Sequence, residues 1–277
     1  MKSMFKVIKE QIDNFHLIKR LSMYELKSSN RNNYLGILWE FINPAIQIAI
    51  YWFVFGFVQD RDTVPGQHGD IPFFVWMLSG ILIWFFVYPA ITQGSKSIYS
   101  RLRMVSRMNF PLSAIPSYVI LSLLYPQLLL MGIIIIIFQF IGYPISIYYL
   151  QIPYFLFAAV IFLFALSLIT TTISTIVRDF QMLLQSLMRV LLYITPILWP
   201  AGRFSDSGTF GKFFDYVMLL NPFYYLVEGY RYALLGEGWF ITAHPTITIY
   251  FWALVLLLLS IGSYMHVKFR RHFIDFL

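Results

Sequence analysis

The feature that most restricts this sequence is a long stretch without charge. Residues 108–177 contain no Asp, Glu, Lys or Arg. A helix that crosses the hydrocarbon core of a bilayer needs about 20 apolar residues, so this stretch is long enough for two crossings. In the whole chain 59% of the residues are hydrophobic and 12% are charged, whereas soluble domains contain about 25% charged residues. The sequence therefore predicts an integral membrane protein.

The apolar stretches are continuous and are broken by Gly and Pro, which indicates an all-α fold and excludes the short alternating strands of a membrane β-barrel. Gly142-Tyr143-Pro144 and Gln151-Ile152-Pro153 divide the uncharged stretch into two spans, because Pro disfavours helix in the residue before it. Six transmembrane helices are predicted, at 37–58, 71–95, 113–141, 153–177, 180–200 and 246–267.

Two further parts flank or interrupt the six spans. Residues 1–35 form a cytoplasmic segment with amphipathic character, and 36–277 form the transmembrane domain. The segment 201–245 contains an apolar stretch, 216–226, that is too short to cross a bilayer. We therefore expect outer helices there that re-enter the membrane from one face.

The positions of Lys and Arg predict the orientation. Basic residues concentrate in 1–35, in the connection 96–112, at Arg178 and at the C-terminus, and they are sparse on the other side. Both termini are therefore expected on the cytoplasmic side of the cell membrane. The net charge of +7 follows from this topology, and no separate basic domain indicates nucleic-acid binding.

Several kinds of chemistry have no motif in this chain. It has no cysteine, which excludes disulfides, zinc thiolates and thiol nucleophiles. Its one Gly-Lys pair, Gly211-Lys212, is followed by Phe213 and is not part of a phosphate-binding loop. We expect no metal, cofactor or catalytic site in this chain, and we expect the energy for any transport to come from another polypeptide.

Two basic segments offer contacts at the inner face. Phe5, Ile8, Ile12 and Phe15 recur at helical spacing among lysines, which is typical of a helix lying in the lipid interface, either as a passive anchor or also in contact with a soluble partner. The connection 96–112 mixes Arg with apolar residues, which favours a short helix that docks on a cytoplasmic protein over the extension of two spans beyond the membrane.

Two observations concern the fifth span and the outer segment. Arg189 lies about 15 Å along a helix from Asp179, where a cation normally faces a cavity or a partner unless it reaches back to the interface. Glu228 and Arg231 are spaced to pair with each other. The outer aromatic residues are expected to anchor at the interface or to stack on sugars: Trp199, Tyr224, Tyr225, Tyr230, Tyr232, Trp239 and Tyr250.

The order of short motifs along the chain resembles the permease subunits of ABC-2-type exporters, in the branch that moves lipid-linked polysaccharides and teichoic acids. The motifs are Glu25-Leu26-Lys27, Leu35-Gly36, Trp39, Asn43-Pro44, Asn109-Phe110-Pro111, Pro116, Val177-Arg178-Asp179, Thr195-Pro196-Ile197, Asn221-Pro222, Glu228, Arg231 and Gly236. Within this branch the chain looks most like the teichoic acid translocation permeases of Gram-positive bacteria.

This resemblance implies a homodimer with two copies of a separate ATPase subunit, which binds ATP and Mg²⁺. The loop 100–112 would be the coupling helix, with Arg101, Arg103, Met104, Arg107 and Phe110 in contact with the ATPase. The segment 15–32 would be an interface helix beside the lipid headgroups, with Lys19, Arg20, Lys27 and Arg31 as its cations.

The resemblance also implies a substrate, which is an anionic polymer linked to undecaprenyl diphosphate. Residues expected along its pathway are Tyr51, Trp52, Phe55, Arg189, Tyr193 and Trp199, and residues expected at the outer gate are Asn221, Pro222, Glu228 and Arg231. The alternatives are an O-antigen or capsular polysaccharide permease, then a drug or lipid exporter, and then a membrane-embedded enzyme that acts on polyprenyl lipids. A passive scaffold subunit would need neither the basic docking loop nor the long outer segment.

Overall fold

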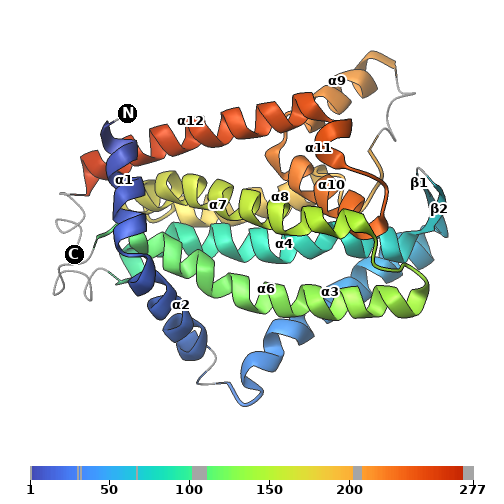
Figure 1. The fold of residues 1–277 in the computed structure, drawn as a ribbon, viewed down its shortest axis with the longest axis horizontal. Helices are drawn as coiled ribbons and strands as arrows, with labels where there is room; N and C mark the ends of the chain where they lie inside the picture. The colour runs from blue at the N-terminus through green and yellow to red at the C-terminus, as the bar shows by residue number, and fades with distance from the viewer. Residues whose placement is uncertain are drawn as a thin grey trace.

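The structure is a computed structural model that describes residues 2–29, 31, 33–66, 68–101, 111–201 and 208–270. It is dominated by long helices that run along one axis (Figure 1). Five of them are long and apolar enough to cross a membrane: Gly36–Val58, Phe73–Lys96 (α4), Ala114–Ile141 (α6), Ile147–Ile176 and Pro245–Phe269 (α12). The prediction of an all-α integral membrane protein is confirmed.

Two of the five spans are composite. The first joins a 3₁₀ turn, Gly36–Leu38 (η1), to α3, Trp39–Trp52, and to a π-helix, Phe53–Val58 (η2). Another joins the 3₁₀ turn Ile147–Leu150 (η4) to α7, Gln151–Ile176. Each predicted stretch at these positions is therefore one continuous helical rod with a locally different pitch.

The fifth predicted span, 180–200, differs from the observed helix. Its helix, α8, covers only Phe180–Ile194, which is about 22 Å long at 1.5 Å per residue and shorter than the roughly 30 Å hydrocarbon core. The helix ends there because Pro196 disfavours helical backbone in the residue before it, and Thr195 is extended, with φ −65° and ψ 136°. Residues 195–200 continue the span as irregular chain.

A small hairpin that the sequence reading did not predict closes the outer end of the first two spans. Strands β1, Thr63–Gly66, and β2, Gly69–Pro72, pair antiparallel, with Thr63 opposite Pro72 and Val64 opposite Ile71. Val64 and Ile71 are buried. Gly69 permits the turn because its φ is +127°, a value that residues with a side chain rarely adopt.

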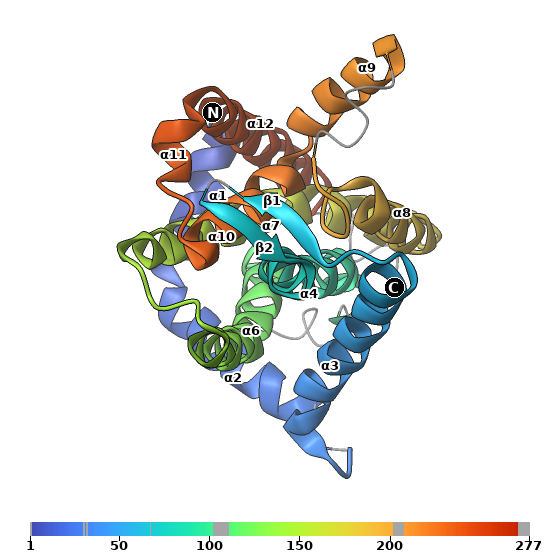
Figure 2. The same ribbon diagram turned by 90° about the vertical axis from the view of Figure 1, so that its right-hand side faces the viewer.

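The helix α4 is the centre of the bundle (Figure 2). It is apolar on all sides, as expected of a helix surrounded by other helices, and 18 of its residues are buried. Helices α6, α7, α8 and α10, Pro222–Leu235, pack around it. In contrast, no residue of α3 between Trp39 and Trp52 is buried, so the first span is only loosely attached to the rest of the chain.

The N-terminal segment forms two helices, α1, Lys2–Asp13, and α2, Phe15–Ser29, which lie across one end of the bundle beside the C-terminal end of α12 (Figure 1). The break falls at Asn14, whose side-chain amide donates to the Glu10 carbonyl at 2.9 Å. Val7 is the side chain of α1 buried against α7 and α12. Phe5, Ile12 and Phe15, from the predicted apolar stripe, stay exposed, as expected of side chains that enter lipid.

The described residues between α8 and α12 form three helices. These are α9, Gly208–Leu219, α10, and α11, Phe240–Ala243. Asn221 caps α10 by accepting from the backbone N–H of Phe223 at 3.0 Å, and Pro222 occupies its first turn, where a missing N–H costs nothing. The helices α10 and α11 lie at the end of the molecule opposite α1 (Figure 1).

Candidate functional site

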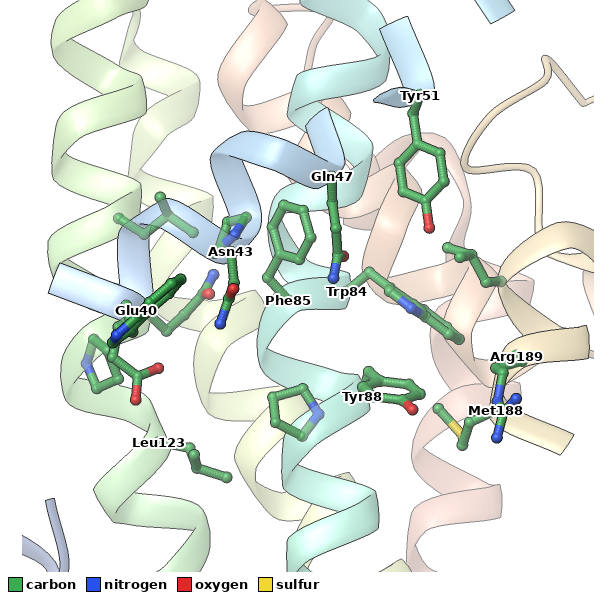
Figure 3. A pocket seen from close by; sticks show the side chains of 17 residues that line it. Glu40, Asn43, Gln47, Tyr51, Trp84, Phe85, Tyr88, Leu123, Met188 and Arg189 are labelled. Atoms are coloured by element: carbon green, nitrogen blue, oxygen red, sulfur yellow. The ribbon is translucent and has the colours of Figure 1, made fainter. Parts of the chain in front are cut away.

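A cavity of about 360 Å³ lies between the loosely attached α3 and the bundle. Its walls come from α3, α4, α6 and α8 (Figure 3). Its aromatic and aliphatic lining is formed mainly by α4 and α6. The residues of the cavity are Trp39, Glu40, Asn43, Pro44, Gln47, Tyr51, Trp84, Phe85, Tyr88, Pro89, Leu123, Pro126, Gln127, Leu130, Met188, Arg189 and Leu192.

The polar side chains of the cavity come largely from one face of α3. Glu40, Asn43, Gln47 and Tyr51 are spaced by three or four residues, which places them on one side of a helix. Figure 3 shows Gln47 and Tyr51 nearer α4 and α8, and Glu40 on the side of Leu123 of α6. No residue of α3 is fully buried, and of these four side chains Tyr51 also packs against the core.

Three prolines inside three different helices line the same cavity: Pro44 in α3, Pro89 in α4 and Pro126 in α6. A proline inside a helix leaves the carbonyl four residues earlier without its helical hydrogen bond. At membrane depth such backbone is tolerated where it faces protein or a water-filled cavity. The prolines therefore add backbone acceptors to the cavity wall.

Glu40 and Arg189 are the two charged residues of the lining, and they lie on opposite sides of the cavity (Figure 3). Within the described ranges neither takes part in a salt bridge. Their formal charges cancel, so the lining as a whole is neutral. Arg189 thus faces a cavity, one of the two outcomes expected for it, and it reaches this position from the middle of α8.

The predicted pathway residues are only partly brought together. Tyr51 and Arg189 line the cavity, whereas Trp52, Phe55, Tyr193 and Trp199 do not. Trp52 contacts Phe74 edge-on at 6.2 Å between ring centroids. Trp199 donates from Nε1 to the Tyr193 carbonyl at 2.8 Å, beyond the end of α8.

The sequence reading missed Asn43 and Gln47, and it treated Glu40 only as a lone acid. The signal that identifies them is the helical spacing of polar residues in an otherwise apolar span. The signal is weak beside the five aromatic residues that the same span contains between positions 51 and 57: Tyr51, Trp52, Phe53, Phe55 and Phe57.

At the outer end, Arg231 of α10 holds the segment that follows α8. Its guanidinium donates from Nη1 to the Pro196 carbonyl at 2.7 Å and from Nη2 to the Ile197 carbonyl at 2.9 Å. It also pairs with Glu228, as the spacing predicted. Arg231 is buried; burial lowers the pKa of its guanidinium, and the Glu228 carboxylate acts in the opposite direction.

Two more side chains fix the same segment. Asn221 donates from Nδ2 to Thr195 Oγ1 at 2.8 Å, and Arg61 donates from Nη1 to the Leu198 carbonyl at 3.3 Å. Three of the four residues predicted at the outer gate, Asn221, Glu228 and Arg231, therefore belong to one network around 195–198, while Pro222 starts α10 beside it.

At the opposite end, the chain on both sides of residues 102–110 is bound to the N-terminal helices. Arg101 forms an ion pair with Glu25 of α2 and lies 5.7 Å from the centroid of the Tyr118 ring. Ser113 donates from Oγ to Glu10 at 2.6 Å and accepts from Gln11. The other predicted coupling residues lie outside the described residues: Arg103, Met104, Arg107 and Phe110.

The predicted cations of the interface helix, Lys19, Arg20, Lys27 and Arg31, are exposed at this end. Such positions leave them available to anionic headgroups. Among the described residues, no three His, Asp or Glu side chains gather as a metal site requires.

The sequence suggested that the outer aromatic residues anchor at the membrane interface or stack on sugars. In the structure some of them are core residues instead. Tyr225 and Tyr230 are buried, and Tyr225 stacks on Phe251 with 4.3 Å between ring centroids. The Tyr225 hydroxyl lies 2.8 Å from that of Tyr154. They are core residues because α10 packs against α7 and α4, whereas Trp239 remains exposed.

Comparison of the sequence with known proteins identifies the family of this chain. The family model described as ABC-2 type transporter matches residues 16–235. The chain is 25% identical over 254 residues to an O-antigen export system permease protein, RfbA, of Myxococcus xanthus, covering 92% of this chain and 93% of the relative. It is 24% identical over 257 residues to a protein of the same name from Klebsiella pneumoniae, with the same coverage. The chain therefore belongs to the ABC-2 type transporter family.

Proposed function

We propose that this chain is the permease subunit of an ATP-driven exporter that moves a lipid-linked polysaccharide of the O-antigen kind to the outer face of the cell membrane. The observation that carries this choice of substrate is the neutral, polar and aromatic cavity between α3 and the bundle. The relatives named as O-antigen export permeases, which align over nearly the whole chain, support the same class of substrate.

The charge of the cavity argues against a polyanion as the preferred cargo. Each repeat of a polyol-phosphate polymer carries a negative charge, which would require a wall with an excess of cations. Here the cationic Arg189 is offset by the anionic Glu40. A glycan that presents mainly hydroxyl groups meets amides, a phenol and aromatic rings instead. The teichoic acid substrate expected from the sequence is thus the less favoured of the two polymers.

A second copy of the chain would complete the pathway. The cavity is open beside α3, which buries no residue of its own, and α8 exposes an apolar stripe that includes Leu183, Leu187 and Val190. Five spans and one short helix in a single chain do not surround a conduit. We therefore propose a homodimer in which two such cavities face a shared path.

Energy would come from two copies of an ATPase subunit, with bound ATP and Mg²⁺, at the end that carries α1 and α2. The ABC-2 family implies such a partner. The loop around Arg101 would contact it, and the exposed cations of α2 would lie beside the headgroups of the inner leaflet. This arrangement places both termini in the cytoplasm, on the side where basic residues accumulate.

The test is reconstitution of the permease with a candidate ABC ATPase subunit. The complex is purified in detergent, placed in liposomes, and supplied with either a neutral glycan or a polyol-phosphate polymer on the same polyprenyl diphosphate. A parallel preparation carries Arg101→Ala, Arg103→Ala and Arg107→Ala together.

We expect a complex of two permeases and two ATPases, faster transfer of the neutral glycan, and loss of coupling in the triple variant. Preferential transfer of the polyol-phosphate polymer would return the substrate to the teichoic acid class. Failure of any ATPase to co-purify would remove the exporter assignment and leave an embedded polyprenyl-lipid enzyme to be tested.

A further inference from the structure

The polar face of α3 has the regularity of a repeated binding surface. Glu40, Asn43, Gln47 and Tyr51 follow one another at intervals of three, four and four residues, which is about one helical turn, or roughly 5.4 Å of rise, per side chain. That interval is comparable to the length of one hexose unit in an extended glycan. All four side chains line the cavity.

These four side chains have no hydrogen-bond or ion-pair partner in the described part of the chain, although Tyr51 packs against the core. Across the described ranges, none of them forms a side-chain hydrogen bond or a salt bridge with another residue. The rest of α3 and the π-helix after it is apolar where it is exposed, as at Ile46, Ile50 and Phe53. Polar groups are costly at membrane depth unless they meet water, protein or a ligand. This unpartnered polar row therefore indicates a function outside the packing of one chain.

The facing wall has complementary chemistry. Trp84, Phe85 and Tyr88 of α4 lie across the cavity from Asn43 and Gln47 (Figure 3). A pyranose ring has hydroxyl groups around its rim and C–H groups on its faces. Amide side chains donate to and accept from hydroxyls, and aromatic rings pack on apolar faces. The two walls together thus fit a chain of sugar rings, and their balanced charge fits a polyphosphate less well.

We propose that the α3 face binds an extended neutral glycan in register, about one sugar residue per helical turn, with Asn43 and Gln47 as specificity-determining residues. The inference rests on the proposed function and adds to it the register and the residues. Repeated, similar and individually weak sites let a polymer advance from one register to the next without a deep energy well, as multi-site conduction requires.

The first experiment compares transport by Asn43→Leu/Gln47→Leu with transport by the unchanged complex and by Gln93→Leu. Gln93 is an exposed glutamine of α4 that does not line the cavity, so its replacement is a matched control. Loss of two hydrogen-bonding side chains is expected to raise the glycan concentration for half-maximal transport about tenfold or more. Co-purification of the ATPase subunit with each variant shows whether the complex assembles.

The second experiment remains informative if the leucine variants fail to assemble. Because the chain contains no cysteine, Gln47→Cys and Ile46→Cys each introduce a single thiol on α3. A neutral lipid-linked glycan held in the complex is expected to slow maleimide labelling at position 47, which lines the cavity, and to leave labelling at position 46 unchanged.

The outcomes separate this inference from the proposed function. Transport of neutral glycan by the unchanged complex, with equal transport by the leucine variant or equal labelling at positions 46 and 47, overturns the binding row and leaves the function in place. Absence of neutral-glycan transport by the unchanged complex overturns both. The row is supported when transport falls in Asn43→Leu/Gln47→Leu but not in Gln93→Leu, and when the glycan protects position 47 but not position 46.

Discussion

The guanidinium of Arg231 lies over the indole ring of Trp76, with 3.6 Å between its Cζ atom and the ring centroid. The contact joins α10 to the central helix α4 and completes the environment of a buried cation that also meets Glu228 and two carbonyl groups. A cation stacked on Trp away from water is a favourable arrangement, worth about 2 kcal/mol when desolvated. Arg231 therefore holds α10 against α4 and against the segment that follows α8.

Arg231→Ala is expected to destabilise the permease strongly. The change leaves the Glu228 carboxylate and the carbonyls of Pro196 and Ile197 without their donor, and breaking a buried ion pair in this way costs about 3–5 kcal/mol. Thermal unfolding of the detergent-solubilised protein should show a midpoint lower by roughly 10 °C. The midpoint of Arg231→Lys should fall between those of the unchanged protein and Arg231→Ala, because an ammonium group keeps the charge but lacks the planar guanidinium fork.

The control for this prediction is Arg189→Ala. Arg189 is exposed in the single chain and has no ion-pair partner among the described residues, so its loss should hardly change the unfolding midpoint. Equal midpoints for the two alanine variants would contradict the role given to Arg231.

Gly80→Ala is expected to displace the Arg231 guanidinium, because Gly80 of α4 lies directly against it. A Cβ atom at Gly80 would lie 2.5 Å from Nη2 of Arg231, and the guanidinium cannot retreat without losing its hydrogen bonds to Pro196 and Ile197. Overpacking of this kind costs about 1–3 kcal/mol. Gly132→Ala in α6 is the control, since a Cβ there meets no atom within 4 Å.

The measurement is again the midpoint of thermal unfolding, followed by co-purification with the ATPase. Gly80→Ala should lower the midpoint, while Gly132→Ala should leave it unchanged or raise it slightly through better helix propensity. A Gly80→Ala protein as stable as the original would show that Arg231 has room to move.

Hydrophobic patterning was enough to predict the membrane fold and the positions of the long helices. The loss of charge over 108–177 requires spanning helices whatever the tertiary packing, because backbone groups in lipid must be satisfied within the helix. The pairing of Glu228 with Arg231 was also predictable, since it depends only on spacing along one helix.

The remainder depends on contacts between distant segments. The spacing of Asn43 and Gln47 is visible in the sequence, but that they face Trp84 and Arg189 is a property of packing. The burial of Tyr225 likewise arises from neighbours that lie far away in the sequence, such as Tyr154 and Phe251. Periodicity in one segment carries no information on which face of it another helix covers.

We expect charge changes in the ion pair between Arg101 and Glu25 to alter the coupling of ATP hydrolysis to transport and to have little effect on folding stability. Both side chains are partly exposed, at 20% and 28%, and pairs of this kind contribute about 1 kcal/mol or less to folding. Arg101→Glu should nevertheless uncouple ATP hydrolysis from transport, because it separates the start of the coupling loop from α2. Combining Arg101→Glu with Glu25→Arg should restore coupling, as measured by glycan transferred per ATP hydrolysed. Failure of the exchange to restore it would show that Arg101 acts through another contact.

Arg189 provides a test of how the substrate enters. If its guanidinium captures the diphosphate of the lipid carrier, Arg189→Ala should raise the substrate concentration for half-maximal transport about tenfold, since a hydrogen bond to a charged group is worth about 1.5–3 kcal/mol. The limiting rate should change little, because the capture interaction is made before the polymer advances. Arg189→Lys should raise this concentration less than Arg189→Ala does, and Glu40→Gln should not raise it.

Initial rates at several substrate and salt concentrations distinguish these cases, since added salt weakens an exposed charge interaction. Transport by Arg189→Ala at the original rate throughout would remove Arg189 from the pathway and leave the polar row on α3 as the principal contact with the cargo.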